Sequence, residues 1–337
     1  MSVDFTHLHV HTQYSLLDGA SKPKELLQRA MELDMDSIAV TDHGNMYGVI
    51  DMYKTARSLS KEAAKEGRPG IKVIFGCECY VAPESRFDRI DKQPRYHLIL
   101  LAENNEGYQN LAHLVSLGFI EGFYRKPRID KAILRQYSKG IIALSACIQG
   151  EIPHLILQRN LEGAERALQE YIEIFGKNNF FLEMQNHDLP EEQTVNLELR
   201  RLAKQYGVGL VVTNDIHYVR KEDASAQDVL LCIQTNKTVN DPDRMKFNND
   251  GYYCKSYEEM LALFPSEEEA LHNTHLIAER CNVDFTFGQL LLPQFPIPAQ
   301  YHEDADAYVR ALCEAEIPGR YGKELDSLAA EAQTTGL

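Results

Sequence analysis

A strand–helix–strand pattern opens the sequence at residues 5–44, FTHLHVHTQYSLLDGASKPKELLQRAMELDMDSIAVTDHG. Phe5–Val10 and Ser37–Thr41 are short runs rich in apolar and β-branched residues, which predicts two strands. Between them, Pro23–Leu33 has a proline in the first turn and repeats its apolar residues at helical spacing, which predicts a helix. Strands separated by a helix pair in parallel through a right-handed crossover, so this unit predicts an α/β fold.

The same alternation of strand and helix continues over most of the chain. Further strands are predicted at Lys72–Val81, His97–Ala102, Gly140–Ser145, Phe180–Met184 and Val208–Thr213. Further helices are predicted at Gly48–Lys65, Glu106–Leu117, Leu161–Phe175 and Glu191–Tyr206. Seven strands with helices between them favour a closed or nearly closed β/α barrel over an open parallel sheet.

The pattern changes after about residue 220. Helical spacing continues there, without a convincing strand, at Ala224–Gln234, Ser256–Phe264 and Ser266–Cys281. Leu292–Pro298 is rich in proline and predicts an extended linker, followed by a helix at Ala305–Glu316 and a frayed end. We therefore expect a barrel in residues 1–220 and a helical extension in 221–290. Residues 291–337 would hold the proline-rich linker and the truncated start of a following region.

The charge balance argues against one class of nucleic-acid binder. The 337 residues include 35 basic and 50 acidic side chains, a formal net charge of −15 at pH 7. This surplus disfavours a protein that holds nucleic acid through its overall field, but not one that contacts phosphate through metal ions. The 7 cysteines include no Cys-x-x-Cys pair, so we expect reduced thiols. Without a membrane-length apolar run or a secretory signal, the sequence predicts a soluble, cytoplasmic protein.

Histidine, aspartate, glutamate and cysteine side chains cluster at the ends of the predicted strands. His9 and His11 are two residues apart, so in an extended chain both imidazoles face the same side. Asp215 and His217 repeat this spacing after the last strand. The other candidates at such positions are Asp18, His43, Glu78, His97 and Cys147. β/α barrels build active sites at the carboxyl ends of their strands, and these residue types bind zinc, manganese or iron.

Nine candidate ligands exceed the roughly four to six that one such ion takes. They fit two or three ions that share bridging carboxylates, with Glu78 and Asp215 as the bridges. A site of this kind binds a phosphate and activates water, so it predicts hydrolysis of a phosphoester. Taken singly, the residues also have ordinary explanations, with Asp42 as a helix cap, Cys147 as a small buried side chain and His97 as a core histidine.

Several segments together resemble the PHP (polymerase and histidinol phosphatase) domain family. The residues that carry the resemblance are His9–Thr12, Thr41–His43, Glu78, His97, Cys147 and Asp215–His217. Longer segments resemble the form of this domain found at the N-terminus of the bacterial replicative DNA polymerase III alpha subunit; they are residues 9–19, 122–130, 213–218 and 290–295. The resemblance extends over nearly the whole chain.

The resemblance implies a distorted seven-stranded, TIM-like β/α barrel, the PHP fold, with up to three divalent ions such as zinc, manganese or iron. By position, it implies that the metal ligands are His9, His11, Asp18, His43, Glu78, His97, Cys147, Asp215 and His217. It also implies a metal-dependent phosphoesterase with 3′–5′ exonuclease (proofreading) activity. For that reaction our hypothesis is that His43 or Asp215 also transfers protons.

The resemblance carries expectations about partners as well. It implies that the partners are a DNA 3′ end bound through the metals, the remainder of the polymerase and other replisome subunits, and no membrane. The polymerase active site of the family's long members would lie beyond Leu337, so we expect this chain to be a fragment that does not polymerise DNA. Two alternatives stay open. One is a catalytically silent, metal-stabilised docking module, and the other is a stand-alone phosphatase for small phosphomonoesters such as histidinol phosphate.

Overall fold

The computed structural model describes residues 3–293, 295–322 and 325–335. The chain divides into two units, Met1–Asp284 and Phe285–Leu337. All nine candidate ligands lie in the first unit. Within the described ranges, no helix combines the length and the apolar character that a membrane crossing requires.

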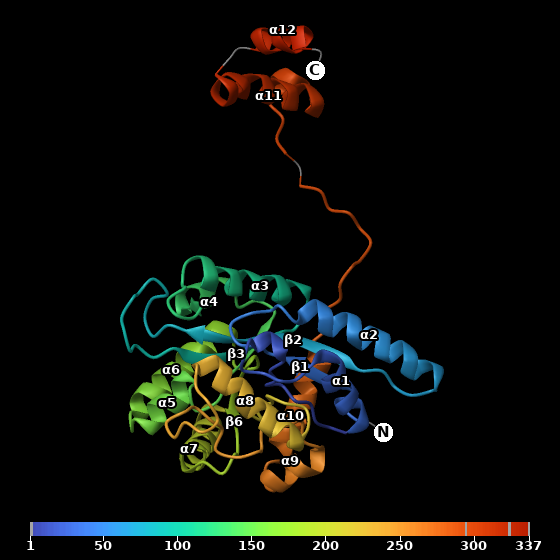
Figure 1. Cartoon of the computed structure of the whole chain (residues 1–337). Coiled ribbons are helices and arrows are strands. Elements are labelled where there is room, and N and C mark those ends of the chain that lie inside the picture. The colour runs from blue at the N-terminus through green and yellow to red at the C-terminus, as the bar shows by residue number, and fades with distance from the viewer. Residues whose placement is uncertain (1–2, 294, 323–324, 336–337) are drawn as a thin grey trace. The chain divides into compact units, whose positions relative to one another are not determined.

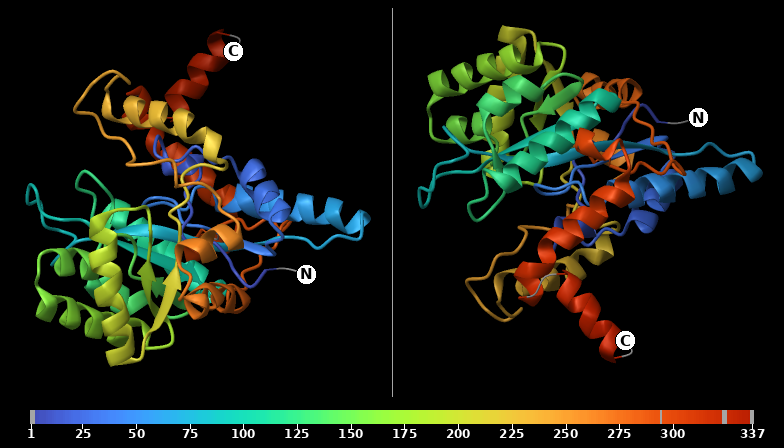
Figure 2. Two further views of the ribbon diagram at one scale, coloured as in Figure 1. Left: turned by 90° about the horizontal axis from the view of Figure 1, so that it is seen from below. Right: turned by 90° about the horizontal axis from the view of Figure 1, so that it is seen from above.

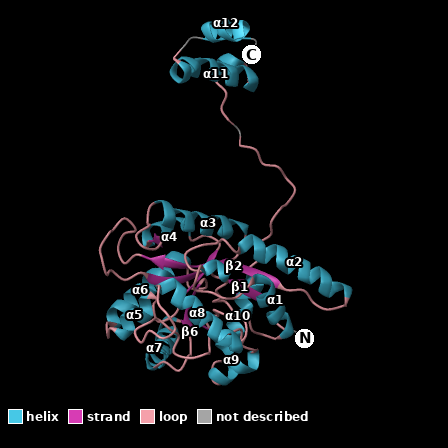
Figure 3. Ribbon diagram, in the orientation of Figure 1, coloured by secondary structure: helices cyan, strands magenta, loops and turns pink. Residues whose placement is uncertain are grey.

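A seven-stranded mixed sheet forms the centre of the first unit (Figures 1 and 3). Its main path runs β1-β2-β3-β5-β6-β7, and a short strand, β4, pairs with β2 off this path. The strands are β1 Ser37–Val40, β2 Lys72–Val81, β3 Tyr96–Ala102, β4 Arg128–Ile129, β5 Ile141–Leu144, β6 Phe180–Met184 and β7 Gly209–Val212. Most strand residues are buried on both faces of the sheet, which explains why the strands are continuous apolar runs in the sequence.

The direction of β3 corrects the prediction that all strands are parallel. β3 runs antiparallel to both of its neighbours, β2 and β5, whereas β1–β2, β5–β6 and β6–β7 are parallel pairs. The physical reason lies in the connection, because residues 82–95 contain no helix and so form no crossover between β2 and β3. The start of β3, which carries His97, therefore lies at the edge where the parallel strands end.

The segment Phe5–Val10 occupies the position of a strand without forming a regular one. On one side the amide of Ala39 in β1 donates to the carbonyl of His7 at 2.9 Å, and on the other the amide of His11 donates to the carbonyl of Ile216 at 2.7 Å. In the described ranges its one ladder contact, between Val10 and Ile216, is an isolated bridge, so the prediction of a regular first strand is wrong. The segment nevertheless joins the two ends of the sheet, and the predicted distorted seven-stranded barrel is confirmed.

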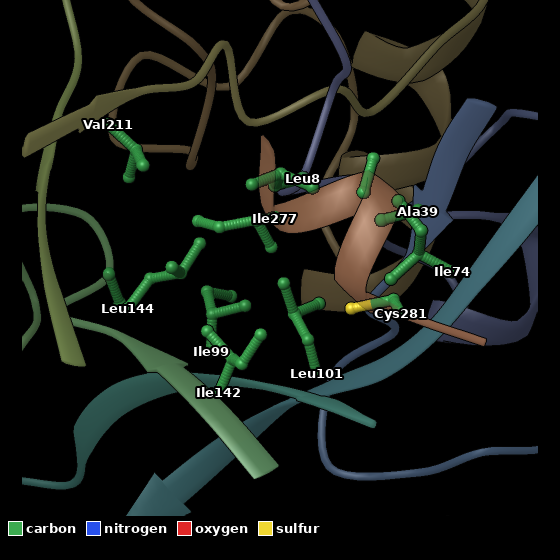
Figure 4. Close-up of a cluster of buried hydrophobic side chains, with 12 residues drawn as sticks. Leu8, Ala39, Ile74, Ile99, Leu101, Ile142, Leu144, Val211, Ile277 and Cys281 are labelled. Atoms are coloured by element: carbon green, nitrogen blue, oxygen red, sulfur yellow. The ribbon is translucent and has the colours of Figure 1, made fainter. Parts of the chain in front are cut away.

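Apolar side chains occupy the interior of the barrel (Figure 4). The buried cluster consists of Leu8, Ala39, Ile74, Ile99, Leu101, Ile142, Leu144, Ala146, Val211, Ile277, Ala278 and Cys281. The last three come from the end of helix α10 (Glu268–Arg280) and the residue after it. Lys72 at the start of β2 donates to the carbonyl of Ala278 at 2.5 Å, so α10 closes the amino end of the barrel and leaves the carboxyl end for the site.

Helices surround the sheet (Figure 2). Those with predicted counterparts are α1 Pro23–Glu32, α2 Val49–Lys65, α3 Asn105–Ile120, α6 Leu161–Phe175, α7 Pro190–Tyr206, α8 Ala224–Thr235, α9 Tyr257–Leu263 and α10. Two further helices, α4 Lys131–Tyr137 and α5 Glu151–Leu157, were not predicted. Each has only 7 residues, which is too short for an amphipathic period to become visible in the sequence.

The described residues of the second unit form two α-helices, α11 Ala305–Tyr321 and α12 Leu325–Thr335, and one turn of 3-10 helix at Ala299–Tyr301. α11 continues beyond its predicted end at Glu316 although Pro318 lies inside it. The prediction of a frayed end is wrong, because α12 occupies that segment and is rich in the helix formers alanine and leucine. The described residues between 285 and 298 form neither helix nor strand, in agreement with a linker. Gln294 of that linker lies outside the described residues.

Candidate metal centre

The structure brings all nine predicted side chains together at the carboxyl end of the barrel. Glu78 belongs to β2 and His97 to β3, and the other residues lie on the segments that follow or close the strands. His97 is included although it begins its strand, because β3 alone runs in the opposite direction to β2 and β5. Eight of the nine side chains form three groups, two of which share His11, and within each group the ligand atoms all lie within 4.8 Å of one another.

The first group consists of His9, His11 and Asp215. Asp215 Oδ1 lies 3.1 Å from His9 Nε2 and 3.2 Å from His11 Nε2. The carboxylate of Glu78 faces the same two imidazoles, at 3.4 Å from each Nε2. Both imidazoles are fully buried, so the group forms the floor of the site.

The second group is built from the imidazoles of His11, His43 and His217. The ring centroids of His43 and His217 lie 4.0 Å and 4.4 Å from that of His11. Asp18 joins them from its loop, with Oδ2 3.2 Å from His43 Nε2. The side chains of Asp18 and His43 are 15% and 12% exposed, whereas the two imidazoles of the first group are fully buried and only its Asp215, at 15%, is partly exposed.

The third group consists of Glu78, His97 and Cys147. Glu78 Oε1 lies 2.7 Å from His97 Nδ1, and the sulfur of Cys147 lies 3.7 Å from the same nitrogen. The other oxygen of Glu78, Oε2, lies 2.5 Å from His43 Nδ1. Glu78 therefore presents one oxygen to each side, which is the arrangement that a bridging carboxylate needs.

Unpaired buried atoms show that these residues fit a metal site. Among the nine candidate ligands, six side-chain atoms are buried without a hydrogen-bond partner: His9 Nε2, His11 Nε2, Asp18 Oδ1, His43 Nδ1, Glu78 Oε2 and Asp215 Oδ1. Burying a polar atom without a partner costs free energy, and native proteins rarely do so. Cations bound in these groups would supply the missing partners. The donor set of imidazole, carboxylate and thiolate suits divalent transition metals.

Mutual electrostatics shift the pKa values of these side chains strongly. Burial opposes the charged form of His43, but the carboxylates of Glu78 and Asp18 outweigh it and raise the pKa of His43 to about 10. Burial also disfavours an ionised Asp215, yet His9 and His217 hold the pKa of Asp215 far below its ordinary value. The carboxylates therefore stay ionised, and protons compete with metal ions for the imidazoles.

The backbone beside the ligands adopts left-handed conformations that most residues avoid. Asp215 itself has φ 48°, and Ala146 and Leu17, which precede Cys147 and Asp18, have φ 61° and 63°. Such conformations cost free energy and cluster at functional sites, because the surrounding structure must impose them. The backbone strain at three ligand-bearing turns is a second line of evidence for a functional site, because it does not rely on where the side chains are placed.

A buried carboxylate that the sequence analysis missed orients His9. Glu183 on β6 accepts a hydrogen bond from His9 Nδ1 at 2.7 Å, which directs Nε2 of the same ring towards Asp215 and Glu78. Glu183 also accepts from Thr213 Oγ1 at 2.5 Å and from Gln185 Nε2 at 3.1 Å. Metal-binding histidines usually have such a partner on the second nitrogen. An acidic residue inside an apolar strand was the signal that could have identified it.

Replacing Glu183 with glutamine is expected to weaken metal binding about 10- to 100-fold, because the amide no longer fixes the tautomer and orientation of His9. The measurement is a titration of the apo protein with Mn²⁺ or Zn²⁺. Glu192→Gln is the matched control, since Glu192 is also buried and bonds a histidine, His187, at 2.8 Å, outside the nine residues. Equal metal affinity of the two variants would contradict a role of Glu183 in positioning His9.

Asp42 orients a second ligand and does not cap a helix. The next helix, α2, has Gly48 at its N-cap. Asp42 instead accepts hydrogen bonds from the amide of Thr12 and from Ser15 Oγ, both at 2.7 Å. Ser15 Oγ also lies 3.0 Å from His11 Nδ1, so Asp42 and Ser15 together hold the ring of His11. The ordinary explanation of Asp42 as a cap is therefore wrong.

The segment of residues 247–255 holds the ligands that follow β7. The amide of His217 donates to the carbonyl of Tyr252 at 2.9 Å, and the ring of Phe247 lies 4.9 Å from that of His217. Asn214, next to Asp215, donates to the carbonyl of Gly251 at 2.8 Å. Residues that lie after the barrel strands therefore help to shape the metal centre, which periodicity in the sequence did not indicate.

A cleft of about 980 Å³ opens onto the centre. Asp18, His43 and His97 line it, together with the ring of Tyr80. A cavity of this size accommodates a small organic ligand or a short stretch of a polymer. The centre can therefore be reached from outside through its upper residues, while His9 and His11 remain buried beneath them.

Comparison with known proteins finds a matching family model and similar polymerase subunits. The family model described as "PHP domain" matches residues 7–187, a range that includes seven of the nine side chains and ends before Asp215. The chain is 44% identical to DNA polymerase III subunit alpha of Treponema pallidum, over 98% of this chain and 28% of that protein. It is 48% identical to the same subunit of Thermus aquaticus, over 87% of this chain and 24% of that protein.

The chain thus spans about a quarter of the length of the curated relatives that it matches. Among solved structures, a proposed metal-dependent phosphoesterase from Bifidobacterium adolescentis matches with a TM-score of 0.41 at 11% identity, over 76% of this chain and 95% of that chain. A similarity at this level is loose, and the site rests on the geometry described above.

Proposed function

Because the chain belongs to the PHP domain family, we propose that it is a metal-dependent phosphoesterase that releases nucleotides from the 3′ end of DNA. The observation that carries the proposal is the cluster of ligand-type side chains whose unpaired buried atoms converge beside an open cleft. The identity to polymerase III alpha subunits supports DNA as the substrate over a small phosphomonoester.

Two or three divalent ions, zinc, manganese or iron, would be held by the nine side chains. The ligand groups are His9, His11 and Asp215; His43, His217 and Asp18; and Glu78, His97 and Cys147. Imidazole and thiolate donors favour these metals over magnesium and calcium, which prefer sites made of oxygen alone. When bound, such ions supply Lewis acidity at the phosphate and lower the pKa of water.

His43 and Asp215 are the proposed catalytic residues. Their side chains are 12% and 15% exposed, whereas His9 and His11 are fully buried. His43 also lines the cleft, where its imidazole can hold or release a proton beside the bond that breaks. Asp215 stays ionised and can accept a hydrogen bond from the attacking water.

We place this activity within a bacterial replicative polymerase in the cytoplasm, with the remainder of that polymerase and other replisome subunits as partners. The support is the identity of 44–48% that extends over most of this chain. This assignment makes removal of a misincorporated 3′ nucleotide the biological purpose of the site.

The test is release of single nucleotides from a 3′-labelled primer with Mn²⁺ or Zn²⁺ present. Asp215→Asn combined with His217→Ala is expected to remove detectable release, because the variant loses ligands from two groups. His272→Ala, which changes a half-exposed histidine outside the site, is the control and should leave the rate unchanged. Unchanged release by the double variant would contradict the proposal.

Two other outcomes would identify the alternatives. Full metal content without any release would favour a docking module that the metals merely stabilise. Turnover of small phosphomonoesters well above that of DNA ends would favour a stand-alone phosphatase.

A further inference from the structure

One wall of the cleft carries three cationic side chains, Lys92, Arg95 and Lys126. In the described part of the chain, none of the three forms an ion pair or a side-chain hydrogen bond. Cations of the same two loops that lie outside the cleft are paired. Arg86 bonds both Glu121 and Asp130, and Arg125 bonds Asp91 at 2.6 Å. The pairing therefore stops where the cleft begins.

These three cations line one cleft although the acidic side chains of the chain outnumber the basic ones by 15. Gln93, between two of these cations, also lines the cleft and has a buried Oε1 without a hydrogen-bond partner. The three cations indicate a wall that is prepared for a negatively charged ligand, and Gln93 Oε1 is free to accept a hydrogen bond from a donor group of that ligand.

The cationic wall and the metal centre share one side chain, Tyr80. The ammonium group of Lys126 lies 5.3 Å from the centre of the Tyr80 ring. The same ring lies 5.3 Å from the imidazole of His97 and 6.1 Å from that of His43. Lys126 is thus separated from two ligand-type residues by the width of one ring, which places it beside the centre and not within it.

The remaining lining suits nucleobases. It includes the amide of Gln149 and the imidazole of His154, whose ring lies 5.4 Å from that of Tyr96 and whose Nε2 lies 2.7 Å from Gln158 Nε2. Aromatic rings stack on unpaired bases, and amides bond base edges. The innermost ligand-type residues are buried, so a terminal phosphodiester can approach them only after it has left a duplex.

We propose that Lys92, Arg95 and Lys126 bind the phosphates of an unpaired polynucleotide strand next to the bond that is cleaved. The inference rests on the proposed function and names the form of its substrate, a single-stranded 3′ end. It also resolves the conflict with the net charge. The overall field repels DNA, whereas three cations at the cleft act at short range on the strand that enters.

The test is binding of a 5′-fluorescein-labelled single-stranded oligonucleotide with a non-hydrolysable 3′ phosphorothioate, followed by fluorescence anisotropy in EDTA. The variant Lys92→Ala, Arg95→Ala, Lys126→Ala is expected to bind at least about tenfold more weakly at low salt. Its plot of log affinity against log salt should be shallower by about 2, at roughly 0.7 for each lost phosphate contact. A blunt duplex of the same sequence should compete poorly.

The matched control is Lys24→Ala, Lys61→Ala, Lys65→Ala, which removes the same charge from exposed lysines of α1 and α2 outside the cleft. The inference would be overturned if the cleft variant bound as tightly as the wild type, or if both variants lost affinity equally. It would also be overturned if the wild type did not bind the strand, or if the duplex competed as well as the single strand. Binding is measured without metal, whereas nucleotide release is measured with Mn²⁺ or Zn²⁺. Intact binding in the first assay without release in the second would therefore refute the proposed function and leave this inference standing.

Discussion

Replacement of Glu78 by glutamine should reduce metal-dependent hydrolysis by about 10³-fold or more, equivalent to about 4 kcal/mol in the activation free energy. Glu78 is 1% exposed and faces four imidazoles, those of His9, His11, His43 and His97. Glutamine keeps the shape but removes the negative charge and one oxygen lone-pair site. The three ligand groups then lose the residue that connects them.

The measurement pairs initial rates with metal content determined by elemental analysis. We expect the Glu78→Gln protein to retain its far-UV circular dichroism while its bound metal falls by one equivalent or more. Glu170→Gln, which changes a carboxylate that bonds Lys131 and Arg135 away from the site, is the control. Full metal content and a rate within threefold of the wild type would show that Glu78 is not a bridging ligand.

Removal of the metals should lower the midpoint of thermal unfolding by about 10 °C or more. A ligand present at about 1,000 times its Kd stabilises the folded state by about 4 kcal/mol, and each kcal/mol shifts the midpoint by about 2–4 °C in a domain of this class. The apo centre places carboxylates and imidazoles together without partners for six buried atoms, so it has no substitute for the ions.

The experiment is calorimetry or circular dichroism with and without EDTA, followed by addition of Mn²⁺ or Zn²⁺. We expect the unfolding midpoint of the wild type to recover when the metal is added back. The Asp215→Asn, His217→Ala variant should respond much less to the metal. A midpoint that chelation leaves unchanged, in a protein shown to have contained metal, would contradict a stabilising role of the ions.

The two predictions separate chemistry from stability. If chelation lowers the midpoint of thermal unfolding but the protein hydrolyses no DNA ends, its metal centre is structural. The alternative of a docking module then gains support. If the protein hydrolyses DNA ends and chelation also lowers its unfolding midpoint, the same ions serve both hydrolysis and stability. Both outcomes are consistent with the geometry, since Glu78 faces the fully buried His9 as well as His43, which is 12% exposed and lines the cleft.

Local patterns predicted the regular elements well where burial was uniform. β2 and β6 have the predicted bounds, and α6 matches at both ends. Most residues of these strands are buried, so their apolar runs are unambiguous. The shortest elements escaped prediction, because a few residues do not display a period.

The candidate ligands could be predicted for a similar reason. His9 with His11, and Asp215 with His217, are each two residues apart, and that spacing alone puts both side chains on one face. Polar residues directly after apolar runs identify the end of the barrel where they gather. Which of them approach one another, at which distances and in which groups, required the closed barrel.

The sequence by itself determined the class of fold, the set of nine ligand-type residues and the resemblance to PHP domains, because these depend on residue type and on spacing along the chain. Only the tertiary structure decided the direction of β3, the role of Glu183 as the partner of His9, the support from residues 247–255, and the cationic wall at Lys126. The physical reason is that these features join residues far apart in the chain. Their energies come from burial and from contacts across the barrel, which no local pattern records.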